Sequence, residues 1–403
     1  MLLHQDAPTD CAALPARRGR PGRRRRYRAA LAVVVVVMLG TGLVVADALQ
    51  APSDDSAAAK LAEWGRNHGL NSVITWLETQ QYNHAPPPVG GLPAEGIPAA
   101  AGALPAPPPG QSPHASAQPP TSPLPTPALT PLAAGPALPG EGGWQTVVTS
   151  RGRPAVQVAT LRPDTLHTSL LAGVMRIDPT LVRGQLHPGT SDPGGSWQAS
   201  TALTGAQLDA VAATFNGGFR LNDPSHNGYY SEGRTVEPLV TGKASLVLHT
   251  DGTADVGTWN QEIQMSADVA SVRQNLLPLV DHGQVNPTCA TGGRAEWGST
   301  VGQAAYIHRS GFGVTATGAE IYVGGPALSV CTLGAILTDA GVVRGMELDI
   351  NPTWVSGTYY HDHPTGPPQG YPLFPDERVS PQHYLSPTSR DWYGWYLRTS
   401  ATR

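Results

Sequence analysis

A proline-rich segment divides this chain and limits what the rest of it can fold into. Residues 84–143 mix proline with alanine, glycine and serine and carry almost no charge. Such sequence lacks the apolar surface that a core needs, and it favours extended polyproline II at about 3.1 Å per residue. We therefore expect a Pro/Ala-rich disordered linker over residues 84–143 and one globular domain over residues 144–400. A domain of that length can bury one substantial core.

The N-terminus carries a membrane signal. A run rich in arginine precedes an uncharged, apolar stretch at residues 29–46, and about 20 such residues span a bilayer. The positive-inside rule places the basic tail, residues 1–28, in the cytoplasm and everything after the stretch outside. We expect a retained transmembrane signal anchor, and hence a single-pass plasma-membrane protein with an extracellular domain. A signal peptide cleaved near Ala46-Asp47-Ala48 is the alternative.

The charge distribution excludes one class of partner. The formal net charge is -4, and many of the basic residues lie in the N-terminal tail, so the remaining chain is distinctly acidic. Binding to a phosphate backbone requires clustered Lys and Arg. We expect no nucleic-acid partner, and a membrane contact only through the N-terminal helix.

The pattern within residues 144–400 is typical of an α+β fold. Apolar segments separated by turn signals such as Asp251-Gly252 and Thr317-Gly318 predict a mixed or antiparallel β-rich domain. Two short helices are expected within it, at residues 204–213 and 329–340. A further, juxtamembrane helical segment is expected at residues 53–82, packed either on the bilayer surface or on the domain.

The three cysteines leave two interpretations open. Cys11 falls in the cytoplasmic tail, whereas Cys289 and Cys331 would share an oxidising exterior in which a disulfide is allowed. Cys331 also lies in an apolar helical pattern, where a small buried hydrophobe is an equally good interpretation.

Each of the two domain helices leads into an apolar segment that ends in polar residues. The first segment ends in Asn216-Gly217-Gly218 and the second in Glu347-Leu348-Asp349. Side chains at strand ends are held at a fixed rim, where a rigid scaffold can position them for chemistry. Consecutive glycines permit positive φ and a close approach of backbone to a ligand, with an ordinary tight turn as the alternative.

Glu347 and Asp349 are the candidate catalytic carboxylates. Their i, i+2 spacing on an apolar strand predicts that both side chains face the same way, with the carboxyls roughly 6–7 Å apart. At such a separation one carboxyl can act as acid and the other as base or nucleophile in glycosidic cleavage. Two ordinary acids on a solvated strand face are the alternative interpretation.

Arg309 lies between two predicted strands and is followed by a glycine-containing segment. A guanidinium fork at that place can bind a phosphate bidentately, or it can be a hairpin-end arginine in solvent. Arg234 and Arg273 are weaker candidates of the same kind for substrate binding. His361-Asp362-His363 lies beside a Pro/Gly-rich loop with no third ligand in place, so we expect no metal site. No cofactor fingerprint is present, and we expect none to be bound.

Three short motifs carry a family resemblance. In order along the chain they are Asn216-Gly-Gly-Phe219, Arg309-Ser-Gly-Phe-Gly313-Val314 and Leu348-Asp349, with a Gly242-Lys243 turn between the first two. Together they resemble the phosphodiester glycosidase family, in an actinobacterial-type branch. The resemblance covers roughly residue 204 to the C-terminus.

This resemblance implies an active site that contains Asn216, Arg309 and Asp349. In the family a glycine triplet follows the aspartate, whereas this chain continues with Ile350-Asn351-Pro352. Backbone amides that glycines present to a ligand cannot be arranged identically around a proline. Substrate contacts are expected from Gly217, Gly218 and Asn351.

The resulting expectation is a membrane-anchored, extracytoplasmic hydrolase that cleaves the glycosidic bond of a sugar phosphodiester, on cell-wall or exported glycopolymers. Asp349 attacks the anomeric carbon or activates water, and Glu347 assists as acid/base. Arg309 neutralises the phosphate as it leaves, and Asn216 orients sugar hydroxyls. The alternatives are a catalytically inactive glycan- or wall-binding module of the same fold, and a structural surface domain.

Overall fold

The computed structural model describes residues 42, 44–51, 53, 55–104, 129–225, 227–361 and 366–399. The chain divides into two compact units, Met1–Ala51 and Pro52–Arg403. In the first unit, residues 44–49 are helical. The expected basic tail at residues 1–28 and most of the expected anchor at residues 29–46 lie outside the described residues. Within the described residues, no helix combines the length and the apolar character needed to cross a membrane.

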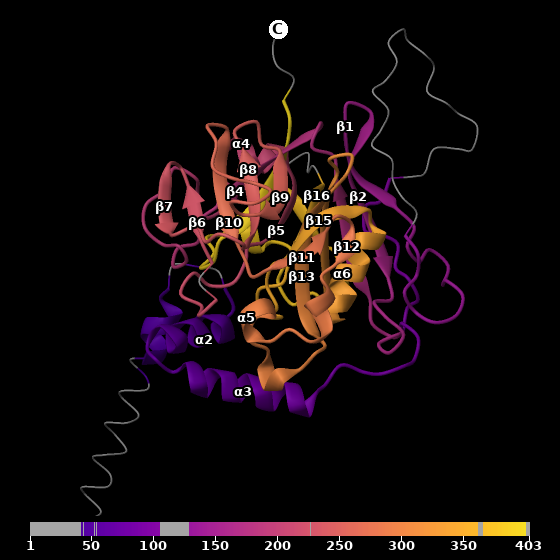
Figure 1. Ribbon diagram of the computed structural model, residues 1–403, viewed down its shortest axis with the longest axis horizontal. Helices are drawn as coiled ribbons and strands as arrows, with labels where there is room; N and C mark the ends of the chain where they lie inside the picture. Colours follow the sequence, from indigo (N-terminus) through magenta and orange to yellow (C-terminus); the bar gives the residue numbers. More distant parts are fainter. Residues whose placement is uncertain are drawn as a thin grey trace, which may run out of the picture. The chain divides into compact units, whose positions relative to one another are not determined.

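The second unit is built mainly of antiparallel sheets (Figure 1). The eight-stranded sheet has the order β1-β2-β3-β14-β13-β15-β11-β12, and two five-stranded sheets have the orders β7-β6-β10-β8-β9 and β17-β16-β5-β18-β4. The strands are β1 (Gln145–Ser150), β2 (Arg153–Leu161), β3 (Ala172–Ile177), β4 (Val182–His187), β5 (Val211–Asn216), β6 (Tyr229–Ser231), β7 (Arg234–Glu237), β8 (Ala244–His249), β9 (Ala254–Thr258), β10 (Val269–Gln274), β11 (Pro278–Asp281), β12 (Gln284–Val285), β13 (Ile307–Thr315), β14 (Glu320–Leu328), β15 (Val342–Glu347), β16 (Gly357–His361), β17 (Gln369–Pro372) and β18 (Trp392–Leu397).

The helices of this unit are few and short. They are α2 (Ala57–Asn67), α3 (Asn71–His84), α4 (Ala206–Ala210), α5 (Arg294–Trp297) and α6 (Val330–Asp339), with 3₁₀ turns η1 (Pro287–Ala290), η2 (Val301–Gln303) and η3 (His383–Leu385). The expected β-rich α+β architecture is therefore confirmed for the described residues, with antiparallel sheets.

An aromatic cluster joins two of the sheets. Phe215 of β5 stacks on Tyr322 of β14 at a centroid distance of 4.5 Å and on Trp395 of β18 at 4.5 Å, and it lies 5.3 Å from Phe312 of β13. All four rings are fully buried. Offset ring pairs add about 0.5–1.5 kcal/mol beyond their burial. The cluster fixes β5 against β13 and β14, directly beside the residues that form the site.

The two predicted helix-then-strand units differ in outcome. α6 begins where expected because Ser329 caps it, its Oγ accepting a hydrogen bond from Thr332 N at 3.0 Å. The expected helix at residues 204–213 is reduced to the five residues of α4. From Val211 onward the chain is fully buried and pairs with β16 and β18 as β5, so sheet pairing takes precedence over helical pattern there.

The expected single helix at residues 53–82 is two helices that pack on the domain. α2 and α3 are separated at Gly69, whose φ of +78° is a left-handed conformation that ends a helix. Arg220 forms an ion pair with Glu63 of α2 at 3.2 Å, and Tyr82 of α3 donates to Tyr306 O at 3.1 Å. The sequence left open whether this segment packs on the bilayer surface or on the domain, and the structure shows it packed on the domain.

The described flanks of the proline-rich segment lie against the domain as well. Gly90 N donates to Leu166 O at 2.7 Å, and Leu104 N donates to Thr146 O at 2.9 Å. Glu141 forms a buried ion pair with Arg162. Residues 105–128 lie outside the described part. Both described flanks of the segment expected to be a disordered linker, residues 84–143, therefore have backbone or carboxylate partners in the domain.

A disulfide between Cys289 and Cys331 settles the alternatives left open by the sequence. It ties η1 to α6 across a separation of 42 residues. Since α6 packs on the eight-stranded sheet, the bridge restrains the loop that follows β12.

Replacing both cysteines by alanine should lower the free energy of unfolding by about 2–4 kcal/mol, because the cross-link restricts the unfolded chain. Urea denaturation of the wild type and the double variant measures the difference. The wild type under reducing conditions is the control and should behave like the variant. An unchanged denaturation midpoint would show that the bridge contributes no stability.

Candidate active site

Two strand ends meet at the candidate site, as the sequence predicted. Asn216 ends β5, Asp349 follows β15, and both side chains line one small cavity. Ser310 of β13 joins them, because its Oγ accepts from Asn216 Nδ2 at 3.0 Å and from Asp349 N at 3.2 Å. The same hydroxyl donates to Asp349 O at 3.2 Å. One buried hydroxyl therefore sets the position of the Asp349 backbone relative to β5.

Protein groups occupy every hydrogen-bonding position of the Asn216 side-chain amide. Besides Ser310, its Nδ2 donates to Gly217 O at 2.8 Å, and its Oδ1 accepts from Tyr322 OH at 2.8 Å and Ser356 N at 3.1 Å. Two donors and two lone pairs are then all occupied. The geometry therefore assigns Asn216 to holding the cavity wall in place, and leaves it no capacity to orient a sugar hydroxyl.

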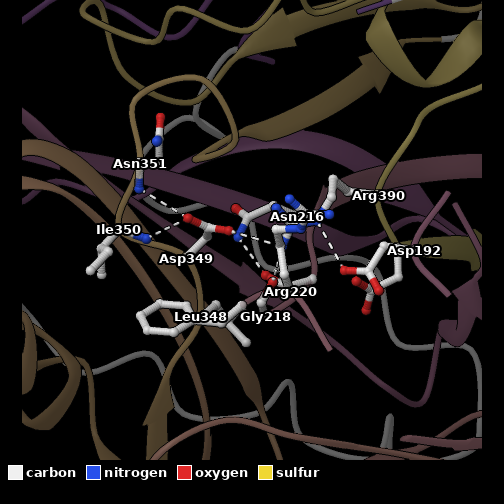
Figure 2. Close-up of polar contacts among 12 residues, drawn as sticks. Asp192, Asn216, Gly218, Arg220, Leu348, Asp349, Ile350, Asn351 and Arg390 are labelled. Carbon is white, nitrogen blue, oxygen red and sulfur yellow. Dashed lines mark hydrogen bonds and ion pairs between the residues drawn. The ribbon is translucent and has the colours of Figure 1, made fainter. Parts of the chain in front are cut away.

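The carboxylate of Asp349 is held asymmetrically (Figure 2). Its Oδ1 accepts from Ile350 N at 2.7 Å and Asn351 N at 2.9 Å. Its Oδ2 lies 3.6 Å from Nη2 of Arg390. Burial raises the pKa of this carboxyl above its ordinary value, while Arg390 and the two backbone N–H groups oppose the rise. One oxygen is thus fixed, and the other is left with a single cation as neighbour.

Glu347 and Arg309 lie in a buried layer that does not line the cavity. Nη1 of Arg309 bonds both carboxylate oxygens of Glu347, at 3.1 and 3.0 Å, and its Nε donates to Leu328 O at 2.8 Å. Both side chains are almost fully buried. Burial raises the pKa of Glu347 to about 7, and Arg309 opposes the rise. Because each charge is used to pair the other, the roles expected for Glu347 as acid/base and Arg309 as phosphate ligand are not supported.

Gly217 and Gly218 line the cavity as expected, but for a different reason. Neither residue has a positive φ. A Cβ on Gly217 would overlap the carboxylate of Asp391, and one on Gly218 would lie 3.1 Å from Asn275 Oδ1. Close approach of the turn to these polar side chains is therefore what requires glycine here.

The C-terminal segment supplies site residues that were missed in the sequence. Arg390 donates to Gly218 O at 3.0 Å and lies 3.3 Å from Asp192 (Figure 2). Its guanidinium carbon is 5.2 Å from the ring centroid of Trp354. The other lining residues not predicted are Trp354, His383, Tyr384 and Asp391. The only local signal was an adjacent Arg-Asp pair directly before the aromatic strand β18.

The remaining predicted arginines lie outside the cavity wall. Arg273 is fully buried and supports the site from behind, through an ion pair with Asp391 at 2.8 Å and a hydrogen bond to Phe219 O. Arg234 is half exposed and stacks on Trp197 at 3.7 Å. It has no contact with the cavity residues among the described interactions, so the structure does not place it in the site.

The cavity itself is small, about 10 Å³, or roughly the space of one water. Its surroundings include contacts from the N-terminal helices. Asn351, expected to touch substrate, donates to Glu78 of α3 at 3.4 Å, and His383 lies 3.5 Å from Asp55 before α2. Of these four residues, His383 lines the cavity itself.

The one group of possible metal ligands among the described residues lies away from the cavity. Within the described residues, the side chains that come close enough to hold a metal ion are the exposed Glu262, Asp281 and His282. None of the three lines the cavity. His361 contacts Ala101 O at 3.3 Å, and Asp362 and His363 lie outside the described part of the chain. The expectation that neither a metal nor a cofactor is required stays a prediction.

Comparison with known proteins gives structural likeness only. No model of a known protein family matches the chain, and no curated protein does. A solved structure of zebrafish N-acetylglucosamine-1-phosphodiester alpha-N-acetylglucosaminidase, a catalytic domain auto-inhibited by its pro-peptide, matches with a TM-score of 0.39 and 14% identity. That match covers 64% of this chain and 88% of the zebrafish chain. The relationship is structural and distant.

Two further solved structures match at a similar level. A hypothetical protein from Synechocystis has a TM-score of 0.30 and 12% identity, covering 63% of this chain and 62% of that one. A putative exported protein from Burkholderia pseudomallei K96243 has a TM-score of 0.28 and 12% identity, covering 57% and 74%.

Glu347→Gln should lower the free energy of unfolding by about 3–5 kcal/mol, because it leaves the Arg309 charge buried without a carboxylate. Asp349→Asn is the matched control. Its amide oxygen still accepts from Ile350 N and Asn351 N, so the change should stay within about 1 kcal/mol. Chemical denaturation compares the two variants. Equal losses would contradict the assignment of Glu347 to a structural ion pair.

Proposed function

We propose that this protein hydrolyses the glycosidic bond of a sugar phosphodiester, with Asp349 as the reacting carboxylate. The supporting observation is the asymmetry of that side chain. Two backbone N–H groups fix Oδ1, whereas Oδ2 accepts no hydrogen bond from the described residues and lies 3.6 Å from Arg390 Nη2. A fixed carboxylate beside a guanidinium at a cavity wall suits attack at an anomeric carbon that carries a phosphate.

A single reacting carboxylate is sufficient to cleave the glycosidic bond of a sugar phosphodiester. Asp391, which also lines the cavity, is held by Arg273 at 2.8 Å, and Glu347 is held by Arg309. A phosphodiester-linked sugar loses a phosphate monoester, whose second pKa is about 6. Such a group departs without protonation, whereas an ordinary alcohol requires a general acid. This chemistry removes the need for the acid/base role that was expected of Glu347.

The proposed reaction breaks the bond between the anomeric carbon and the bridging phosphate oxygen. The bonding electrons go to that oxygen, and Arg390 offsets the charge that develops on the phosphate. Water supplies the hydroxyl group of the released sugar. If Asp349 accepts the proton of that water, the anomeric configuration inverts. If Asp349 first forms an ester with the sugar that water then hydrolyses, the configuration is retained.

The expected extracytoplasmic location is part of this proposal. The disulfide between Cys289 and Cys331 supports an oxidising compartment. Anchoring through residues 29–46 would then hold the domain outside the plasma membrane, where cell-wall or exported glycopolymers with sugar phosphodiesters are the substrates to test.

Asp349→Asn should reduce turnover of an activated sugar phosphodiester about 10³-fold or more, because the amide neither attacks carbon nor accepts a proton. Release of phosphate monoester measures the rate, and proton NMR of the first-formed sugar anomer identifies inversion or retention. The half-exposed Arg344→Gln, whose partner is Asp255, is the control and should react like the wild type. Equal rates for Asp349→Asn and the wild type would remove Asp349 from the mechanism.

A catalytically inactive glycan- or wall-binding module is the competing proposal. It predicts that the wild type binds a panel of sugar phosphodiesters and turns over none of them. That pair of results would replace the hydrolase proposal.

The ionised form of Asp349 reacts, so kcat/KM should fall as the pH drops through the pKa of this carboxyl. Because burial raises that pKa, the fall, which is the acidic limb of the pH profile, should occur at a higher pH than for an ordinary aspartate. Arg390 lowers that pKa, so Arg390→Gln should move the limb to still higher pH. Rates from about pH 3 to 8 test this. A limb that stays in place or moves to lower pH would contradict the contact between Arg390 and Asp349.

A further inference from the structure

A second arginine lies beside the proposed reaction centre and has no role in the reaction so far. Arg220 follows the Gly217-Gly218-Phe219 turn directly, so the turn that lines the cavity also positions its guanidinium (Figure 2). Its side chain is only 15% exposed. It forms an ion pair with Glu63 of α2 at 3.2 Å and donates to Asn67 Oδ1 at the end of the same helix.

Arg220 and Arg390 are neighbouring cations: Arg390 lies 3.3 Å from Asp192 Oδ2, and the same carboxylate accepts from the backbone N–H of Leu221, the residue after Arg220. Burial lowers the pKa of Arg220, and Arg390 lowers it further by charge repulsion. Two neighbouring cations require nearby anions, and the carboxylates of Glu63 and Asp192 act on both, raising the pKa of each arginine. Among the described residues, Nε of Arg220 has no hydrogen-bond partner, and Nε of Arg390 lies 3.3 Å from Asp192 Oδ2 without a well-aligned hydrogen bond. Two neighbouring guanidinium forks are suited to the oxygens of a phosphate.

Glu63 forms an ion pair with Arg220, but this ion pair lacks well-aligned hydrogen bonds. Its side chain is buried, yet neither carboxylate oxygen has a hydrogen bond with good geometry to any described residue. The buried pair between Arg162 and Glu141 is different, because Glu141 accepts two side-chain bonds, at 2.9 and 2.8 Å. Charge attraction alone holds Glu63 at Arg220, so another anion with better geometry can replace it.

α2, which carries Glu63, and α3 bury few apolar side chains, although Tyr82 of α3 packs on an apolar cluster that includes Phe219. α2 buries only Ala59, Glu63 and Gly65, and none of the fourteen residues of α3, all of them described, is buried. The contacts near the cavity are polar, from Asp55 to His383 and from Glu78 to Asn351. Little hydrophobic stabilisation is lost when such a segment moves away.

We propose that Arg220 and Arg390 form a subsite for the phosphate of the substrate, and that the Glu63 carboxylate occupies this subsite until a phosphate displaces it. The inference rests on the proposed function for the identity of the ligand. Arg220 then sets specificity for anionic aglycones, and phosphate binding displaces Glu63 of α2 from the two arginines. The aglycone phosphate and the carboxylate of α2 compete for the same two guanidinium groups.

Binding of inorganic phosphate to the full-length protein tests the subsite without turnover. Isothermal titration at constant ionic strength, with chloride as the reference anion, separates binding from screening. Arg220→Gln should weaken phosphate binding about tenfold or more, since hydrogen bonds to a charged group are lost. Arg344→Gln, the matched surface control, should leave binding unchanged. Glu63→Gln should tighten binding, because the competing charge is removed.

Hydrogen exchange of the α2 backbone provides an independent readout. Phosphate should speed exchange over Ala57–Asn67 in the wild type, and Glu63→Gln should show faster exchange without phosphate. Phosphate binding that Arg220→Gln leaves intact, or that Glu63→Gln weakens, would overturn the proposal. Phosphate-dependent exchange in a protein that cleaves no sugar phosphodiester would support the subsite and reject the hydrolase.

Should Arg220→Gln fail to fold, Arg220→Lys keeps the charge and removes the fork. It should bind phosphate more weakly than the wild type while retaining its melting temperature. Wild-type affinity in Arg220→Lys would contradict recognition by the guanidinium geometry.

Discussion

Charges buried at the strand ends must be paired, and this constraint organises the whole site. Arg309 with Glu347, and Arg273 with the cavity-lining Asp391, form a polar layer of buried ion pairs at the site. Removing either member of such a pair leaves an isolated charge in a medium of low dielectric, at a large cost. The layer therefore fixes the end of β15 against β13 and the start of β18 against β10. Asp349 and Arg390 each lie next in sequence, or nearly so, to a member of these pairs, and their positions follow from it.

The parts of the fold that depend on local chemistry could be predicted from the sequence. The turn at Asp251-Gly252 joins β8 and β9, and the Ser329 cap begins α6, because turn and cap residues act within a few positions. The order of strands in the sheets depends on contacts between distant segments and had no local signal. The same applies to α4, where pairing of β5 with β16 and β18 shortened a helix that the pattern favoured.

The site was predictable in position and only partly in role. Asn216 and Asp349 were placed correctly because polar residues at the ends of apolar strands meet at a rim. The i, i+2 spacing did not show that Glu347 pairs with Arg309 away from the cavity, whereas Asp349, beyond the end of β15, lines it. Arg390 and Asp391 come from a segment about forty positions later, and no spacing along the chain relates them to Asp349. Sheet pairing of β18 with β5 and the ion pair between Asp391 and Arg273 bring them there.

The attachment of α2 to the same chain as the cavity has a consequence for the choice of ligand. A tethered carboxylate faces the two arginines at an effective concentration of the order of millimolar, whatever the protein concentration. A small soluble phosphate must reach comparable levels to compete with it. A polymer that carries many phosphodiesters presents a dense array of anions at one place, and rebinding along that array favours it over isolated molecules.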